Sequence, residues 1–77
     1  MMESKKLVFL GIVNDIRESK GKSVLEELRL ELNLRKDLGF DSMDLAILTA
    51  RLEEEFQVDV FENGIVSTVE EVMERLG

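Results

Sequence analysis

The chain has 77 residues, enough for one small domain with a single core. It contains no cysteine and no histidine, which excludes thiol nucleophiles, disulfides, Cys/His zinc sites and histidine-based catalytic triads. A net charge of −7 argues against nucleic acid or an anionic membrane as a partner. The absence of Trp and Tyr argues against aromatic platforms on which bases or sugars stack.

The first predicted element is a helix over residues 3–18, which ends in the Ser-Lys-Gly-Lys-Ser turn of residues 19–23. Its buried stripe consists of Phe9, Ile12, Val13 and Ile16. The apolar run of residues 7–13 is too short to span a bilayer and lacks a small-residue cleavage site. We therefore expect a cytoplasmic protein that does not insert into the membrane.

Residues 23–41 are the least regular stretch. Residues 28–35 alternate apolar and polar side chains, a pattern typical of a strand. A strand needs a partner, and residues 58–61 are the only other candidate. We therefore favour an extended loop whose leucines reach inward over a hairpin-like pairing, with Gly39 at its final turn.

The clearest helical pattern runs from Ser42 to Phe56, and its buried stripe consists of Leu45, Leu48, Leu52 and Phe56. Asp41, with Asp44 three residues later, has the spacing of a helix N-cap and its reciprocal partner. A second face carries Met43, Ile47 and Ala50, alongside Arg51 and Glu54. Either a neighbouring helix buries this second face, or the face is a docking surface for another protein. Periodicity favours neither alternative.

A last helix is predicted from Val69 to Leu76, and a short additional helix fits between residues 60 and 66. The expected fold class is therefore all-α. It is a small antiparallel bundle of three to four helices with a long first loop, in a single domain over residues 1–77.

A rival site lies in residues 59–70, which partly match a calcium-binding EF-hand loop. Asp59, Asn63, Gly64 and Glu70 stand at the first, fifth, sixth and twelfth positions. Phe61 at the third position supplies no oxygen ligand, and the sequence has no second loop. We expect a turn here and no metal.

Ser42 is chemically the most interesting residue, because it stands at the first turn of the predicted 42–56 helix. Free backbone N–H groups and the positive end of the helix dipole favour a phosphate ester on a hydroxyl placed there. A serine at a helix start is also commonly no more than a cap. Nothing adjacent in the sequence would activate it as a nucleophile, so another enzyme would have to modify it.

Residues 37–44, Asp-Leu-Gly-Phe-Asp-Ser-Met-Asp, resemble the D-L-G-x-D-S-[LM]-D signature of the acyl carrier protein family. Residues 52–56, Leu-Glu-Glu-Glu-Phe, are similar to the end of that family's second helix, and Thr68-Val69 stand where its last helix opens. Residues 1–36 agree with the family only in length and in having one helix followed by a long loop.

The resemblance implies that Ser42 carries 4′-phosphopantetheine, transferred from coenzyme A by a magnesium-dependent phosphopantetheinyl transferase. The thiol of this arm would hold acyl or aminoacyl groups as thioesters. A ligase or transferase would load them and downstream synthases would use them, so the chain is expected to be a monomeric carrier and not an enzyme. The thiol of the arm also supplies the sulfur that a chain without cysteine lacks.

The same resemblance places Asp41 where the transferase engages and Met43 where partner enzymes meet the arm, with Leu38 in the core and Phe40 beside the arm. The full set of expected partner-recognition residues is Asp41, Met43, Asp44, Ile47, Arg51 and Glu54, on a helix whose acidic surface would meet basic partners.

Two residues depart from the family pattern. Ile47 stands where fatty-acid-synthesis carriers usually have Glu, and Arg51 where they have small or apolar residues. We therefore expect a carrier dedicated to one pathway, such as secondary-metabolite synthesis, polysaccharide modification or aminoacyl loading. The alternative function is a non-catalytic helical interaction module in which Ser42 is only a cap.

Overall fold

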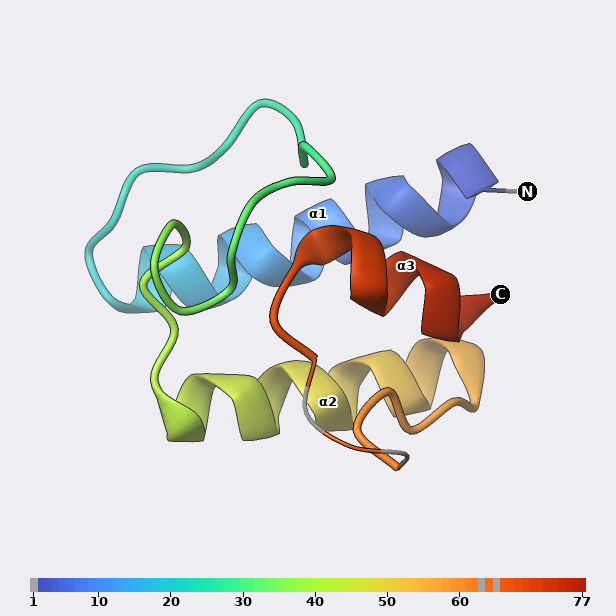
Figure 1. Cartoon of the computed structure of the whole chain (residues 1–77). Coiled ribbons are helices and arrows are strands. Elements are labelled where there is room, and N and C mark those ends of the chain that lie inside the picture. The colour runs from blue at the N-terminus through green and yellow to red at the C-terminus, as the bar shows by residue number, and fades with distance from the viewer. Residues whose placement is uncertain (1, 63, 65) are drawn as a thin grey trace.

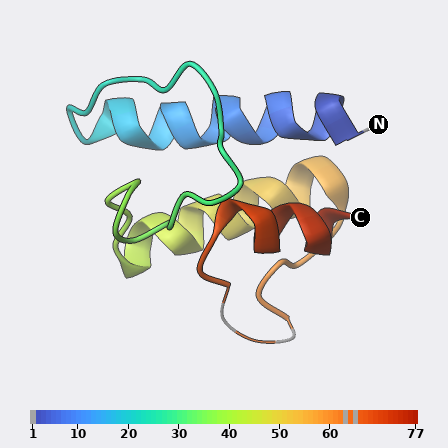
Figure 2. The same cartoon turned by 45° about the horizontal axis from the view of Figure 1, so that its top comes forward.

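The computed structural model describes residues 2–62, 64 and 66–77. This part of the chain contains three helices, α1 (Met2–Ser19), α2 (Ser42–Phe56) and α3 (Val69–Leu76), joined by two connections. Figures 1 and 2 both show α1 running antiparallel to α2 and α3. The all-α prediction is confirmed, and the three main helices begin and end within a residue or so of the predicted bounds.

The short additional helix between residues 60 and 66 does not form in the described part of that segment. Residues 60–62 make turns, residue 64 lies in a bend, and residues 63 and 65 fall outside the described part. None of the described helices combines the length and hydrophobicity that a bilayer crossing requires.

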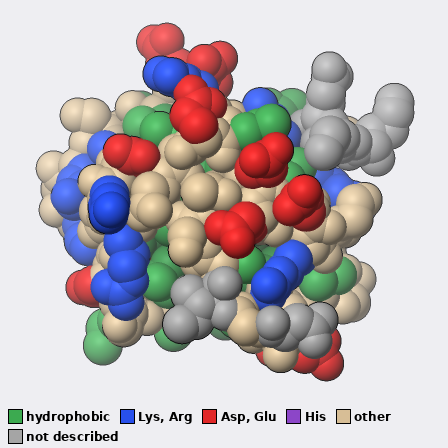
Figure 3. All heavy atoms as spheres, in the orientation of Figure 1, with side chains coloured by type: hydrophobic (Ala, Val, Ile, Leu, Met, Phe, Trp, Pro, Cys, Tyr) green, Lys and Arg blue, Asp and Glu red, His purple; other side chains and the backbone are tan. Residues whose placement is uncertain are grey.

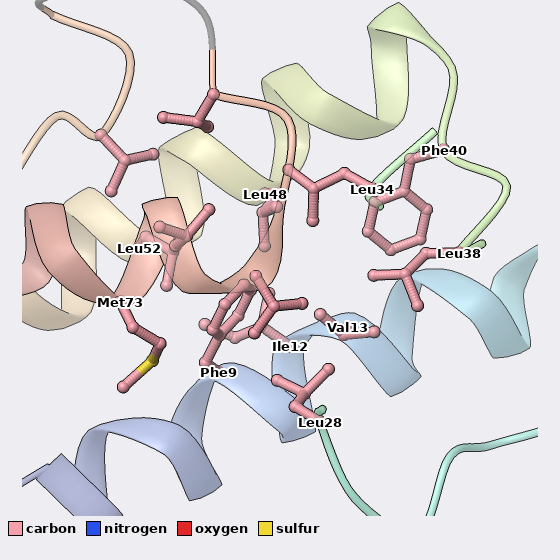
Figure 4. Packing of buried hydrophobic residues seen from close by; sticks show 14 of the residues in the cluster. Phe9, Ile12, Val13, Leu28, Leu34, Leu38, Phe40, Leu48, Leu52 and Met73 are labelled. Atoms are coloured by element: carbon pink, nitrogen blue, oxygen red, sulfur yellow. The ribbon is translucent and has the colours of Figure 1, made fainter. Parts of the chain in front are cut away.

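Apolar side chains from all three helices and from both connections meet in one core (Figure 4). The stripe predicted for α1 is confirmed, since Phe9 and Val13 are 0% exposed and Ile12 and Ile16 are 3% exposed. On α2, Leu48 and Leu52 are fully buried, whereas Leu45 and Phe56 are half-buried at the edge of the core.

The long connection between α1 and α2 is a loop with turns at residues 30–31 and 34–37, and only some of its leucines reach inward as predicted. Leu28 and Leu34 are each 1% exposed, while Leu30 is 40% exposed. The hairpin-like pairing with residues 58–61 is absent. The loop instead pairs with the start of α3, where Leu34 N donates to Ser67 O at 2.8 Å and Val69 N to Leu32 O at 3.0 Å.

This pairing has a clear physical cause. Turns at residues 30–31 and 34–37 break the extended conformation, so the leucines of residues 28–34 do not share one face as they would on a strand. Where the two short segments meet, each satisfies backbone groups of the other. The pairing holds the long loop against the start of α3, and therefore also holds the segment that leads into α2.

Candidate functional site

The start of α2 is closed by a reciprocal cap, as the sequence predicted. The side chain of Asp41 accepts a hydrogen bond from Asp44 N at 2.9 Å, and that of Asp44 accepts one from Asp41 N at 3.0 Å. Ser42 is therefore the first helical residue and does not serve as the cap. Its side chain is exposed, so the hydroxyl is accessible at the positive end of the helix.

Two cations, one in the last turn of α1 and one just after the helix, hold the loop that precedes Ser42. Arg17 Nη1 donates to Leu38 O at 2.9 Å, and Lys20 Nζ donates to Gly39 O at 3.0 Å. Gly39 has a φ of 74°, a left-handed conformation that glycine adopts without strain. Leu38 is 1% exposed, as expected. Phe40 is 2% exposed and belongs to the core, so the expectation that it flanks the arm is wrong.

Asp44 is the buried acidic group of the site, with 7% of its surface exposed. Burial alone would raise the pKa of its carboxyl, but hydrogen bonds from Lys20 Nζ and Asp41 N outweigh this and lower the pKa. Lys20 Nζ also lies 3.9 Å from a carboxylate oxygen of Asp41. The Asp44 carboxylate is thus satisfied inside the chain, a position that does not fit its predicted contact with partner proteins.

Replacement of Lys20 by alanine is expected to destabilise the fold by about 1–2 kcal/mol, because it leaves a nearly buried carboxylate without its cation. The matched control is Lys22→Ala, which removes an exposed lysine of the same turn with no carboxylate partner among the described residues. Urea unfolding of the two variants measures the difference, and equal stabilities would show that Lys20 does not support Asp44.

Stability is expected to fall as the pH drops below about 4. The folded chain holds protons on Asp44 and Glu71 more weakly than the unfolded chain, because hydrogen bonds lower the pKa of both carboxyls. The stabilisation is therefore present above the unfolded pKa and is lost as the pH falls through the folded pKa. Urea unfolding at pH 7 and pH 3 tests this, and Asp44→Asn should show a shallower loss.

A contact that the sequence did not suggest joins the long loop to Ser42. Arg35 Nη2 donates a hydrogen bond to Ser42 Oγ at 3.0 Å. Arg35 lies in the loop and Ser42 on a helix, so no common periodicity relates them. The hydroxyl therefore combines a guanidinium partner with the positive end of α2, surroundings that suit an esterified phosphate.

A groove begins at Ser42 and follows α2. It has a volume of about 490 Å³ and is lined by Ser42, Leu45, Ala46, Thr49, Ala50, Glu53, Asp59 and Phe61. Most of the lining side chains are apolar or small. A flexible chain attached to the Ser42 hydroxyl could therefore lie along α2 with part of its surface removed from water.

The second face of α2 is exposed, so the structure does not bury it against a neighbouring helix. Met43 is 73% exposed, Ile47 is 44% exposed, and Glu54 is also exposed. Arg51 Nη1 donates to the Asp15 carboxylate of α1 at 2.9 Å, so its charge is already paired within the chain. An apolar patch of Met43 and Ile47 thus remains open to solvent beside Ser42.

Charge is distributed unevenly over the surface. Figure 3 shows Lys and Arg side chains gathered on the left, over the end of α1 and the connection to α2. The C-terminal end of α2 instead carries the exposed Glu53, Glu54 and Glu55. A basic region thus lies near Ser42, and an acidic region lies about 16 Å further along α2, at Glu53. Met43 and Ile47, which form the apolar patch, stand between these two regions along the helix.

The residues of the calcium-loop alternative serve structural roles where the structure describes them. An Asp59 carboxylate oxygen accepts from Phe61 N at 3.0 Å, which closes a local turn, and Glu70 lies on α3. Asn63 is outside the described part of the chain. Elsewhere, the described residues contain no group of three acidic side chains arranged to hold a metal ion.

Comparison with known proteins points in one direction. Residues 22–76 match the family described as "Phosphopantetheine attachment site". An acyl carrier protein of Trieres chinensis is 35% identical over 72 residues, covering 80% of this chain and 90% of that protein. An acyl carrier protein of Cyanophora paradoxa is 30% identical over 76 residues, covering 96% of this chain and 74% of that protein. No solved structure matches.

Proposed function

The chain belongs to the acyl carrier protein family, and from this premise we propose that it carries acyl or aminoacyl groups on a 4′-phosphopantetheine arm attached to Ser42. Members of this family are carrier subunits that other enzymes load and use, and phosphopantetheine is their prosthetic group. The observation that carries the assignment to Ser42 is its exposed hydroxyl at the first position of α2, within the family signature.

The residues around Ser42 fit such an arm. The reciprocal cap of Asp41 and Asp44 and the Lys20 contact hold the start of α2 in place, so the hydroxyl is presented without a change in the backbone. The groove along α2 provides a largely apolar surface against which the arm can lie. When bound, phosphopantetheine supplies a thiol that forms thioesters with carboxylic acids, a chemistry that no side chain of this chain provides.

The exposed face of α2 supports a docking role toward the phosphopantetheinyl transferase and the enzymes that load and use the cargo. Met43 and Ile47 offer a small apolar contact next to the arm, and Asp41 and Glu54 are exposed on either side of it along the chain. Since Ile47 and Arg51 differ from the pattern of fatty-acid-synthesis carriers, we propose partners from one dedicated pathway.

Met43→Ala is expected to raise the KM of the transferase for this chain at least about threefold, with stability changed by less than about 0.5 kcal/mol. The reason is that Met43 is largely exposed and packs little within the fold. Leu7→Ala is the matched control, because Leu7 is 69% exposed on α1, away from Ser42 in the sequence. Equal KM values for the two variants would remove Met43 from the docking surface.

The absence of cysteine provides a direct test of the carrier role. The purified apo chain should contain no thiol. After incubation with coenzyme A, magnesium and a phosphopantetheinyl transferase, followed by removal of small molecules, a thiol reagent should detect one thiol per chain. Ser23→Ala, which alters another exposed serine, should behave like the wild type. A thiol count of zero alongside an active control carrier would contradict the proposal.

A further inference from the structure

The contact of Arg35 with Ser42 goes beyond what the family signature requires. Among the described residues, the Arg35 guanidinium has Ser42 Oγ as its one hydrogen-bond partner and no carboxylate at ion-pair distance. The other arginines are occupied. Arg29 and Arg51 bind the carboxylates of Glu31 and Asp15, and Arg17 and Arg75 bind backbone carbonyls.

We propose, on the premise that Ser42 carries the arm, that Arg35 binds the phosphodiester that joins the arm to Ser42. After attachment, the phosphorus is bonded to the very oxygen that the guanidinium contacts at 3.0 Å. The non-bridging phosphate oxygens then lie one bond beyond that phosphorus. A guanidinium carries five donors in a planar fork that matches a phosphate, and four of the five have no partner among the described residues.

Arg35 is held in place for this contact before any arm is attached. Its backbone N donates to Asn33 Oδ1 at 2.9 Å, and its carbonyl accepts from Gly39 N at 3.1 Å. The preceding residue, Leu34, is anchored in the core. The guanidinium can therefore reach the phosphate by side-chain rotation alone, which lowers the entropic cost of the contact.

The surrounding charges leave Arg35 available to the phosphate. Asp41 and Asp44 are the carboxylates next to Ser42 in the chain, and both lie at Lys20, which reduces their repulsion of a new negative charge. The start of α2 adds favourable backbone N–H groups. Because Arg35 is exposed, the contact is expected to weaken as salt rises.

The test compares the arm-bearing and arm-free forms of four chains: wild type, Arg35→Gln, Arg35→Lys and Lys36→Gln. Lys36→Gln is the matched control, since it removes an adjacent, also exposed positive charge whose side chain makes no hydrogen bond or ion pair among the described residues. Excess transferase drives each chain to full modification, which intact mass verifies. Thermal unfolding at low salt and phosphorus NMR of the phosphodiester are then measured for each pair.

Arg35→Gln is expected to lower the Tm difference between arm-bearing and arm-free forms by roughly 2–5 °C relative to wild type, and to shift the phosphorus resonance. Lys36→Gln should keep both wild-type values, and Arg35→Lys should recover part of the Tm difference. Identical Tm differences and resonances in all chains would overturn the role of Arg35 alone. Failure of the wild type to accept any arm would overturn the proposed function as well.

Discussion

Ser42→Ala is expected to abolish attachment of the arm while leaving the fold intact. The cap of α2 is provided by Asp41 and Asp44, so alanine at the first helical position costs no cap hydrogen bond. Alanine is also the better helix former. We expect stability within about 0.5 kcal/mol of wild type, because the substitution removes a single side-chain hydrogen bond, the exposed one to Arg35.

Circular dichroism with urea unfolding measures the stability of Ser42→Ala, and the thiol count measures its capacity to carry cargo. The expected pair of results is a wild-type unfolding curve and no thiol. If the chain were instead an interaction module, Ser42→Ala would leave its binding to partner proteins intact. A thiol count of one in Ser42→Ala would place the arm on another residue.

Leu48→Ala is expected to produce the largest loss of stability, about 2–5 kcal/mol. Leu48 is 0% exposed and lies at the centre of the core shared by the helices (Figure 4). Its truncation removes buried apolar surface and leaves a cavity that close-packed neighbours fill only in part. A domain of this size has a total stability on the order of 4–12 kcal/mol, so this loss is a substantial share of it.

Leu7→Ala provides the matched control, because the same side chain is removed from an exposed position on α1. We expect a change of less than about 0.5 kcal/mol for this variant. Urea unfolding of both variants gives the two free energies directly. Similar losses for Leu7 and Leu48 would contradict the burial of Leu48 in the core.

The helices and the core were predictable from sequence because their signals are local and periodic. The i, i+3, i+4, i+7 stripe of Phe9, Ile12, Val13 and Ile16 needs no knowledge of the rest of the chain to be interpreted as one buried face. The Asp41 cap was predictable for the same reason, since an N-cap and its partner three residues later form a short-range pattern.

The features that were missed or mistaken depend on contacts between distant parts of the chain. Lys20 lies 24 residues from Asp44, and its hydrogen bond is what makes Asp44 a structural residue and not a surface contact for partners. The pairing of Leu34 with Ser67 and the burial of Phe40 likewise follow from how the loop packs against α1 and α3. Periodicity carries no information about such contacts.

The exposure of Met43 and Ile47 lies between these cases. The sequence showed that α2 has a second apolar face, but the choice between burial and docking required the positions of the other helices. Because α1 and α3 both pack on the Leu48 and Leu52 side, Met43 and Ile47 stay exposed, and Arg51 alone of this face bonds to α1 among the described residues.

The most direct test of the central claim is the intact mass of the purified chain before and after incubation with coenzyme A, magnesium and a broad-specificity phosphopantetheinyl transferase. We predict a gain of one phosphopantetheine, located by fragmentation on Ser42. An unchanged mass on a folded chain, with the host's own transferase and with a control carrier modified in the same tube, would contradict the carrier function.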